Sequence, residues 1–366
     1  MNEHTRPASV SNRLRIIDCD IHPRIDSPAE MKPFLSARAW ALWQTYGTRN
    51  RHGYAKGHPY PKSQPDSGMR RDAYPPDGTM AGSSLAFMRE QHLDAYDVEF
   101  GVLNPLSPSG QGEMNIELSA ALATASNEWQ LAKWVRNEPR LKASIIVPYE
   151  DPQAAVAEIR RRAGSRDFCQ VLLMSRTNEA LGRRKYWPIY EAAVEAGLPV
   201  GIHVFGFSGW ASTSTGWCSY YIEEMTEHAA SCSAMVTSMI VEGLFEHLPE
   251  LKIVVIESGF AWMPSLGWRL DSNWKKLKFE TPHLRKAPSE YLRNHFWVTT
   301  QPMEESERAR DVMDVMDWIG WDHILFASDY PHWDFDDPYH AIPPVFGEEK
   351  RRMIFNQNAR RVFNFD

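Results

Sequence analysis

The chain has 366 residues, 43% hydrophobic and 24% charged, which is enough apolar material for one large α/β barrel or two smaller domains. Its net charge of -7 and its scattered basic residues exclude an ordinary nucleic-acid-binding surface. Four well-separated cysteines without a Cys-x-x-Cys pair argue against a disulfide framework and a thiolate metal site. No stretch approaches the roughly 18 apolar residues of a membrane span, and the first residues lack an apolar leader, so we expect a cytoplasmic protein.

After a polar N-terminal arm, residues 1–15, short apolar runs alternate with amphipathic stretches, as in repeated βα units. A first strand is predicted at 16–22, followed by a long insertion at 23–95. Seven further strands are predicted at 100–104, 141–148, 168–175, 198–205, 252–258, 296–301 and 324–329. Eight strands, apolar on both faces, predict one parallel (β/α)8 barrel over residues 16–366. An open doubly wound sheet is the alternative, but no Gly-rich phosphate motif follows the first strand.

Polar residues close three of these strands. Asp20 and His22 end the first strand, His203 ends the fifth and Asp329 ends the eighth. Side chains two apart share a strand face, and the carboxyl ends of barrel strands meet at one mouth. The small Gly201, two positions before His203, is expected to leave room for an ion. Each residue alone has a plain alternative, as a helix cap or a satisfied buried group, but together they favour a metal site.

The chain resembles the amidohydrolase superfamily in its Asp-x-His strand, its Gly-Ile-His-Val strand, its Ser-Asp-Tyr-Pro-His run ending at His332 and its closing Asn-Ala-Arg-Arg run. More narrowly it is similar to the amidohydrolase-related branch that includes aminocarboxymuconate semialdehyde, resorcylate and carboxyvanillate decarboxylases. The resemblance implies a distorted (β/α)8 TIM barrel of the metal-dependent hydrolase type, commonly a homodimer. It also implies one divalent ion, bound by the residues that match Asp20, His22, His203 and Asp329.

The types of ligand indicate which ion binds, and the residues at the end of the fourth strand indicate how many ions bind. Carboxylates and imidazoles suit Zn²⁺, which we favour, and also Mn²⁺. In much of the superfamily a carboxylated lysine at the end of strand four bridges two metals. Here that strand ends Val-Leu-Leu-Met-Ser at Ser175, without a lysine, so we expect one ion.

The chain departs from the decarboxylases at strand six, where Glu257 replaces their histidine. Asp329 and Glu257 could share the base and acid roles that a metal-activated water requires. An extra carboxylate near an anionic substrate costs about 1 kcal/mol or more unless it is protonated. We therefore favour a hydrolase of a small aromatic or cyclic compound, with an aromatic-acid decarboxylase as the alternative and a noncatalytic barrel with a structural metal as the third possibility. Anchoring of the turn is the plain alternative for Glu257.

Supporting candidates for the site are less specific. His332 is a candidate to contact substrate or to hold its own loop, and His228 is expected on the surface or at a helix cap. Arg71, in the insertion, is a candidate to pair with an acidic substrate. Rings concentrated after strands five and six suggest an aromatic substrate pocket. These rings are Phe205, Phe207, Trp210, Trp217, Tyr220, Tyr221 and Trp262.

Overall fold

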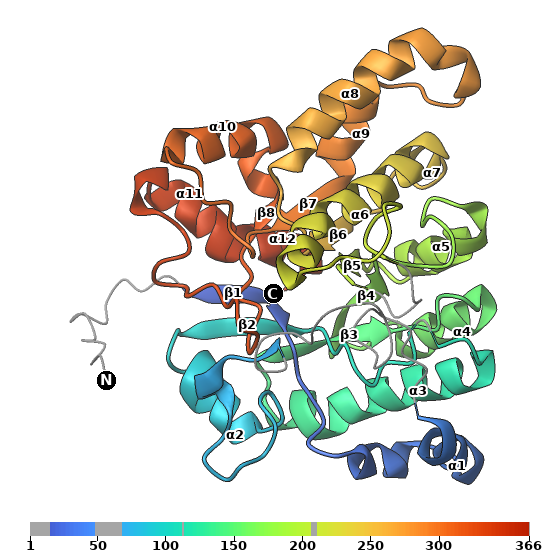
Figure 1. Ribbon diagram of the computed structural model, residues 1–366, viewed down its shortest axis with the longest axis vertical. Coiled ribbons are helices and arrows are strands. Elements are labelled where there is room, and N and C mark those ends of the chain that lie inside the picture. The colour runs from blue at the N-terminus through green and yellow to red at the C-terminus, as the bar shows by residue number, and fades with distance from the viewer. Residues whose placement is uncertain (1–14, 48–67, 112, 206–210, 366) are drawn as a thin grey trace.

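The protein is described by a computed structural model, which covers residues 15–47, 68–111, 113–205 and 211–365. Eight parallel strands form one sheet in which each strand pairs with the next along the chain (Figure 1). The strands are β1 (Ile16–Ile21), β2 (Val98–Leu103), β3 (Leu141–Ile146), β4 (Phe168–Met174), β5 (Val200–His203), β6 (Ile253–Ile256), β7 (Phe296–Thr299) and β8 (Ile324–Leu325). The predicted (β/α)8 barrel is confirmed.

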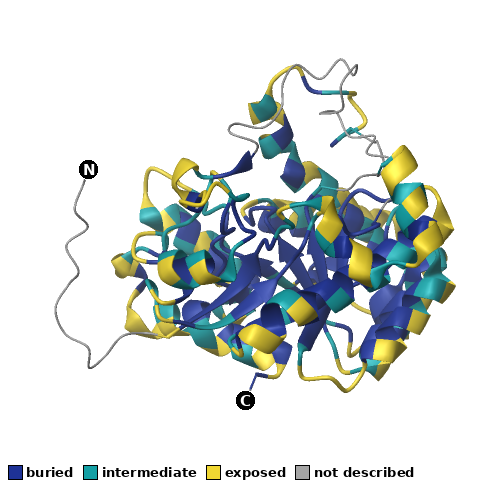
Figure 2. Ribbon diagram, turned by 90° about the horizontal axis from the view of Figure 1, so that it is seen from below, coloured by how far each residue is buried: buried dark blue, intermediate teal, exposed yellow. Residues whose placement is uncertain are grey.

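Helices surround the sheet, and the strands at the centre are buried on both faces (Figure 2). Asp151 caps the helix that begins at Pro152, because its carboxylate accepts from the N–H of Ala154 at 3.1 Å. The helices are α1 (Ala37–Tyr46), α2 (Leu85–Met88), α3 (Ile116–Trp129), α4 (Pro152–Arg162), α5 (Trp187–Glu195), α6 (Tyr221–Val241), α7 (Leu244–His247), α8 (Trp262–Leu277), α9 (Pro288–His295), α10 (Ala309–Ile319), α11 (Glu348–Arg352) and α12 (Asn358–Phe363). Among these described helices, none is long and apolar enough to cross a membrane.

Irregular backbone hydrogen bonds join β1 to the segment that follows β8. The N–H of Cys19 donates to Phe326 O at 3.0 Å, and the N–H of His22 donates to Tyr330 O at 2.7 Å. Between them the N–H of Asp329 donates to Asp20 O at 3.1 Å. These bonds nearly close the barrel and bring the polar ends of the first and eighth strands together, because the two backbones lie side by side.

Part of the insertion packs against the loop after β8. Met69 pairs with His332 in an antiparallel bridge, and the N–H of Arg70 donates to Pro331 O at 3.0 Å. The insertion therefore reaches the barrel mouth, where parallel barrels carry their active sites. Residues 1–14 of the predicted arm lie outside the described ranges.

Candidate metal centre

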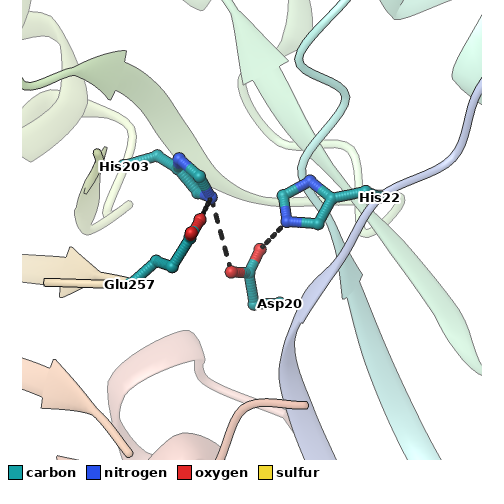
Figure 3. Close-up of side chains that lie close together, drawn as sticks. All are labelled: Asp20, His22, His203 and Glu257. Carbon is teal, nitrogen blue, oxygen red and sulfur yellow. Dashed lines mark ion pairs between the residues drawn. The ribbon is translucent and has the colours of Figure 1, made fainter. Parts of the chain in front are cut away.

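Four buried side chains from three strand ends converge at the mouth (Figure 3). His22 Nε2 lies 3.1 Å from Asp20 Oδ1, and His203 Nε2 lies 3.4 Å from Asp20 Oδ2. His203 Nε2 also lies 3.0 Å from Glu257 Oε2. None of the four is more than 2% exposed. Sequence reasoning placed Glu257 beside this cluster, whereas the structure makes it a member.

The atoms that face the centre of the cluster fit a divalent cation. Asp20 Oδ2, His22 Nε2, His203 Nε2 and Glu257 Oε2 are buried and have no hydrogen-bond partner. The other nitrogen of each ring donates to a backbone carbonyl, His22 Nδ1 to Asn104 O at 2.7 Å and His203 Nδ1 to Val204 O at 2.8 Å. Because Nδ1 carries one proton, each Nε2 can offer a lone pair to a cation once it releases its own proton, which is how imidazoles present themselves to metals.

Asp329 approaches the same centre from the side of His22. Its Oδ1 lies 2.8 Å from His22 Nε2 and 2.6 Å from His332 Nδ1. The His332 ring also stacks on the His22 ring at a centroid distance of 4.3 Å. The four predicted ligands are therefore brought together, and His332 lies against them. Glu257 and Asp329 both have left-handed backbone, with φ of 60° and 62°, a strain that is often found at functional sites.

The charges of the cluster oppose the effect of burial on its histidines. Burial alone would lower the pKa of His203, but Asp20 and Glu257 raise it to about 10. Burial raises the pKa of Glu257 to about 7, and the charge of Asp329 acts in the same direction. Burial would also raise the pKa of Asp20, yet His22 and His203 hold it well below its usual range. Without a cation, the cluster therefore retains protons that a bound metal would displace.

Affinity for Mn²⁺ is expected to rise with pH. Because the pKa of His203 is about 10 in the metal-free protein, its Nε2 must release a proton before it can bind a metal. Each displaced proton should raise the affinity by about tenfold per pH unit between roughly pH 6 and pH 8. Calorimetric titration in buffers of different ionisation enthalpy measures both the affinity and the number of protons released. An affinity that does not change over this range would contradict the proton assignment.

A polar network inside the barrel orients two of the candidate ligands. The Asn104 amide donates to Asp20 Oδ1 at 2.8 Å, and Asn104 O accepts from His22. Asn104 Oδ1 in turn accepts from Ser144 at 2.7 Å and from Gln170 at 2.9 Å. Gln170 belongs to β4. Sequence reasoning missed this network, although Asn104 ends a predicted strand, because it considered only carboxylates and imidazoles as candidates at the strand ends.

The network also corrects the expectation about Gly201. A Cβ on Gly201 would lie 2.6 Å from Gln170 Oε1, so the Gln170 side chain fills the space below His203 that was expected to hold an ion. Gly201 has no side chain so that the Gln170 amide can approach its backbone closely, and not so that a metal can.

Replacing Asn104 by alanine is expected to weaken Mn²⁺ binding by about 10- to 100-fold, as the loss of groups that orient metal ligands does elsewhere. The physical reason is that Asp20 would lose the donor that fixes its orientation. Calorimetry on the purified variant measures the change. The matched control is Asn178→Ala at an exposed position, and equal affinities for the two variants would remove Asn104 from the site.

Of the remaining residues that were predicted to contact substrate, some lie beside the metal centre and others do not. Phe205 stacks on His203 with ring centroids 6.3 Å apart. The Trp262 indole donates to the backbone carbonyls of Ser258 and Gly259 at 3.2 and 3.0 Å, so it contacts the turn after Glu257. Arg71 is exposed, in the part of the insertion that follows Arg70. Trp210 lies outside the described residues, as does Phe207.

Asp334 and Gln301 are further polar residues at the mouth that sequence reasoning missed. Gln301 Nε2 donates to Asp334 Oδ2 at 3.2 Å and to Asp329 Oδ2 at 3.4 Å. Burial, together with Asp329 and Glu257, raises the pKa of Asp334 to about 9. An available signal was the position of Gln301 at the predicted end of strand seven.

Comparison with known proteins agrees with this architecture. The gamma-resorcylate decarboxylase of Rhizobium radiobacter is 25% identical over 296 residues, which cover 75% of this chain and 85% of that enzyme. A crystal structure of 2,6-dihydroxybenzoate decarboxylase from Rhizobium matches with a TM-score of 0.68 at 20% identity, covering 96% of this chain and 99% of that one. The dihydroxybenzoic acid decarboxylase of Polaromonas, solved with manganese and the inhibitor 2-nitroresorcinol, matches with a TM-score of 0.65 at 17% identity over 96% and 97% of the two chains. Residues 17–365 match the amidohydrolase family model, and the chain therefore belongs to the amidohydrolase family.

Proposed function

We propose that the protein is a divalent-metal-dependent, nonoxidative decarboxylase of an aromatic carboxylic acid. The observation that carries the proposal is the buried convergence of Asp20, His22 and His203 with two further carboxylates, in a chain whose curated relatives include gamma-resorcylate decarboxylases. These relatives favour the carboxy-lyase over the hydrolase that the sequence alone ranked first. The proposed substrate is a small aromatic acid, since those relatives are decarboxylases of gamma-resorcylate.

In this proposal Asp20, His22, His203 and Asp329 hold one ion. Glu257 Oε2 also faces the centre, where it is placed to carry a proton beside the ion rather than to bind the ion. Manganese is preferred to zinc, because hard carboxylate oxygens suit Mn²⁺ and a Polaromonas relative was solved with manganese. When bound, the ion supplies positive charge that stabilises negative charge developing on the substrate oxygens.

Glu257 is proposed to carry the proton that decarboxylation requires. In the balanced reaction an aromatic carboxylate takes up one proton at the ring carbon, the carbon–carboxylate bond breaks, and carbon dioxide leaves. A carboxyl with a pKa of about 7 can be protonated near neutral pH and give up that proton to a weakly basic carbon. His332 donates to Asp329 and thereby holds that carboxylate ionised and oriented.

The hydrolase is the second candidate, and Glu257 is the observation that favours it. The carboxyl replaces the histidine of the decarboxylases and adds negative charge where an anionic substrate would bind. A neutral ester or amide avoids that repulsion, and Glu257 and Asp329 would then share the proton transfers of hydrolysis.

Decarboxylation is tested by incubating Mn²⁺-loaded protein with a panel of hydroxybenzoates in D₂O. We expect release of carbon dioxide in equal amount to the aromatic product, with deuterium at the carbon that lost the carboxylate. Asp20→Asn is the inactive control, because it removes a charge that faces the cluster. Absence of carbon dioxide release with every acid, together with turnover of neutral esters or amides, would replace the proposal with the hydrolase.

Homodimer formation stays a prediction. Large apolar side chains on α8 and just after it are exposed, Trp268 at 62% and Phe279 at 77%. Figure 1 shows α8 and α9 extending away from the barrel. Such a surface is compatible with association of two copies.

A further inference from the structure

His228 is a buried histidine whose ring has no hydrogen bond. It lies on α6, is 3% exposed, and neither Nδ1 nor Nε2 has a partner. Glu224 and Cys232, four residues before and after it, are buried on the same face of the helix. The expectation of a surface or capping role for His228 is wrong, because this face points inward. Burying an imidazole without partners costs free energy that an apolar side chain would avoid.

A single phenylalanine ring separates His228 from the candidate metal centre. The Phe205 ring contacts the His228 ring edge-on at a centroid distance of 4.5 Å, and it also stacks on His203. The backbone of Phe205 is left-handed, with φ of 72°. Its carbonyl accepts from the N–H of Arg176 at 3.0 Å and from the Ser175 hydroxyl at 3.2 Å. Two hydrogen bonds from the end of β4 thus hold this strained residue between the two histidines.

Arg176 brings the guanidinium of a buried ion pair with Glu224 to the same place. It is 6% exposed, follows β4, and places its guanidinium 5.7 Å from the Phe205 ring centroid. Glu224 orients it by accepting from Nη2 at 2.6 Å, and the Ser212 hydroxyl fixes Glu224 at 2.7 Å. Burial first, and then Arg176, hold the pKa of His228 well below its usual range. His228 is therefore neutral near pH 7 and offers one N–H donor and one lone pair.

We propose that His228 and Arg176 form a distal subsite that binds a second acidic oxygen of the aromatic substrate. The inference rests on the proposed function, in which the first carboxylate is lost at the metal centre. Carboxylates crowd that centre, so a second anionic group is repelled there. Beside Phe205, the second anionic group would lie near the oriented guanidinium of Arg176 and the neutral imidazole N–H of His228. The substrates are therefore aromatic acids that carry a carboxylate or an ionised phenol on the side of the ring away from the carboxylate that leaves.

Calorimetric binding of nitro compounds to the Mn²⁺-loaded protein tests the subsite without turnover. A nitro group resembles the leaving carboxylate in shape but cannot be lost as carbon dioxide. The probes are nitrobenzene, 4-nitrobenzoate and 4-nitrophenol, and the two acidic probes distinguish a distal carboxylate from a distal phenol. We expect the wild-type protein to prefer at least one acidic probe to nitrobenzene by about tenfold or more, the equivalent of about 1.4 kcal/mol.

His228→Phe keeps a ring but removes both nitrogens, so it should abolish this preference while leaving manganese content and nitrobenzene affinity unchanged. His228→Asn, which keeps a donor, should retain part of the preference and serves if the phenylalanine variant does not fold. The matched control is His247→Phe, at a partly exposed histidine that stacks on Trp187. Wild-type preference in both His228 variants would overturn the subsite. Failure to release carbon dioxide would count against the proposed reaction but would leave this preference measurable.

Discussion

Replacing His203 by alanine is expected to eliminate stoichiometric manganese binding and all turnover. The Nε2 of this ring lies within 3.4 Å of both Asp20 and Glu257, so His203 is the imidazole that joins these two carboxylates in Figure 3. Without the ring, the two buried carboxylates face each other across a cavity. Removal of an orienting group already costs about 10- to 100-fold in metal affinity, and loss of a direct ligand should exceed that.

The same substitution should destabilise the metal-free protein. Removal of one partner from a buried charged pair typically costs about 3 to 5 kcal/mol in the free energy of unfolding. Elemental analysis after gel filtration gives the metal content, and urea unfolding of metal-free protein gives the stability. His247→Ala, at a partly exposed histidine, is the control. Full manganese occupancy in His203→Ala would show that the ion binds elsewhere.

The barrel was predictable because the strands are short, mostly apolar runs that are largely buried on both faces. The strand β8 was expected to reach Asp329 but ends at Leu325. The residues after Leu325 bond to β1 through single irregular hydrogen bonds, such as Cys19 N–H to Phe326 O, rather than through a regular ladder. The apolar pattern of a sequence identifies a buried extended segment. It does not distinguish a regular strand ladder from pairing through single irregular hydrogen bonds.

The meeting of Asp20, His22, His203 and Asp329 followed from their positions at strand ends. The inclusion of Glu257 did not, because its left-handed backbone directs the side chain to His203 and nothing in the local sequence requires that turn. The roles of Asn104 and Gln170 depend on which side chains fill the barrel interior, and this is decided by packing among strands far apart in the chain.

The burial of His228 was open to prediction. Glu224, His228 and Cys232 are spaced by four residues in a helical segment, so they share one face, and the apolar Met235, Val236 and Met239 continue that face. The polar residues at its start obscured the pattern. A hydrophobic stripe interrupted by a histidine and a glutamate, next to a catalytic strand end, is the feature that would have identified them.

Replacing Glu257 by glutamine is expected to lower turnover by about 10²- to 10⁴-fold, the usual contribution of a general acid, while one manganese ion stays bound. Glutamine has the same size as glutamate and would adopt the same left-handed backbone at this position. Its amide cannot deliver a proton as the carboxyl can. Burial and Asp329 raise the pKa of Glu257 to about 7, so the wild-type carboxyl is protonated below that pH and can donate. The loss should therefore be largest in steps that protonate the ring carbon.

Glu257→His provides the matched comparison, because it introduces the histidine that the resemblance to the decarboxylases implies at this position. An imidazole can also hold and donate a proton near neutral pH. We expect the histidine variant to release carbon dioxide faster than the glutamine variant at equal manganese content. The close approach of Glu257 Oε2 to His203 Nε2, 3.0 Å, makes the metal measurement decisive. If manganese is lost in proportion to activity in both variants, Glu257 is a ligand of the ion and the proton must come from another group.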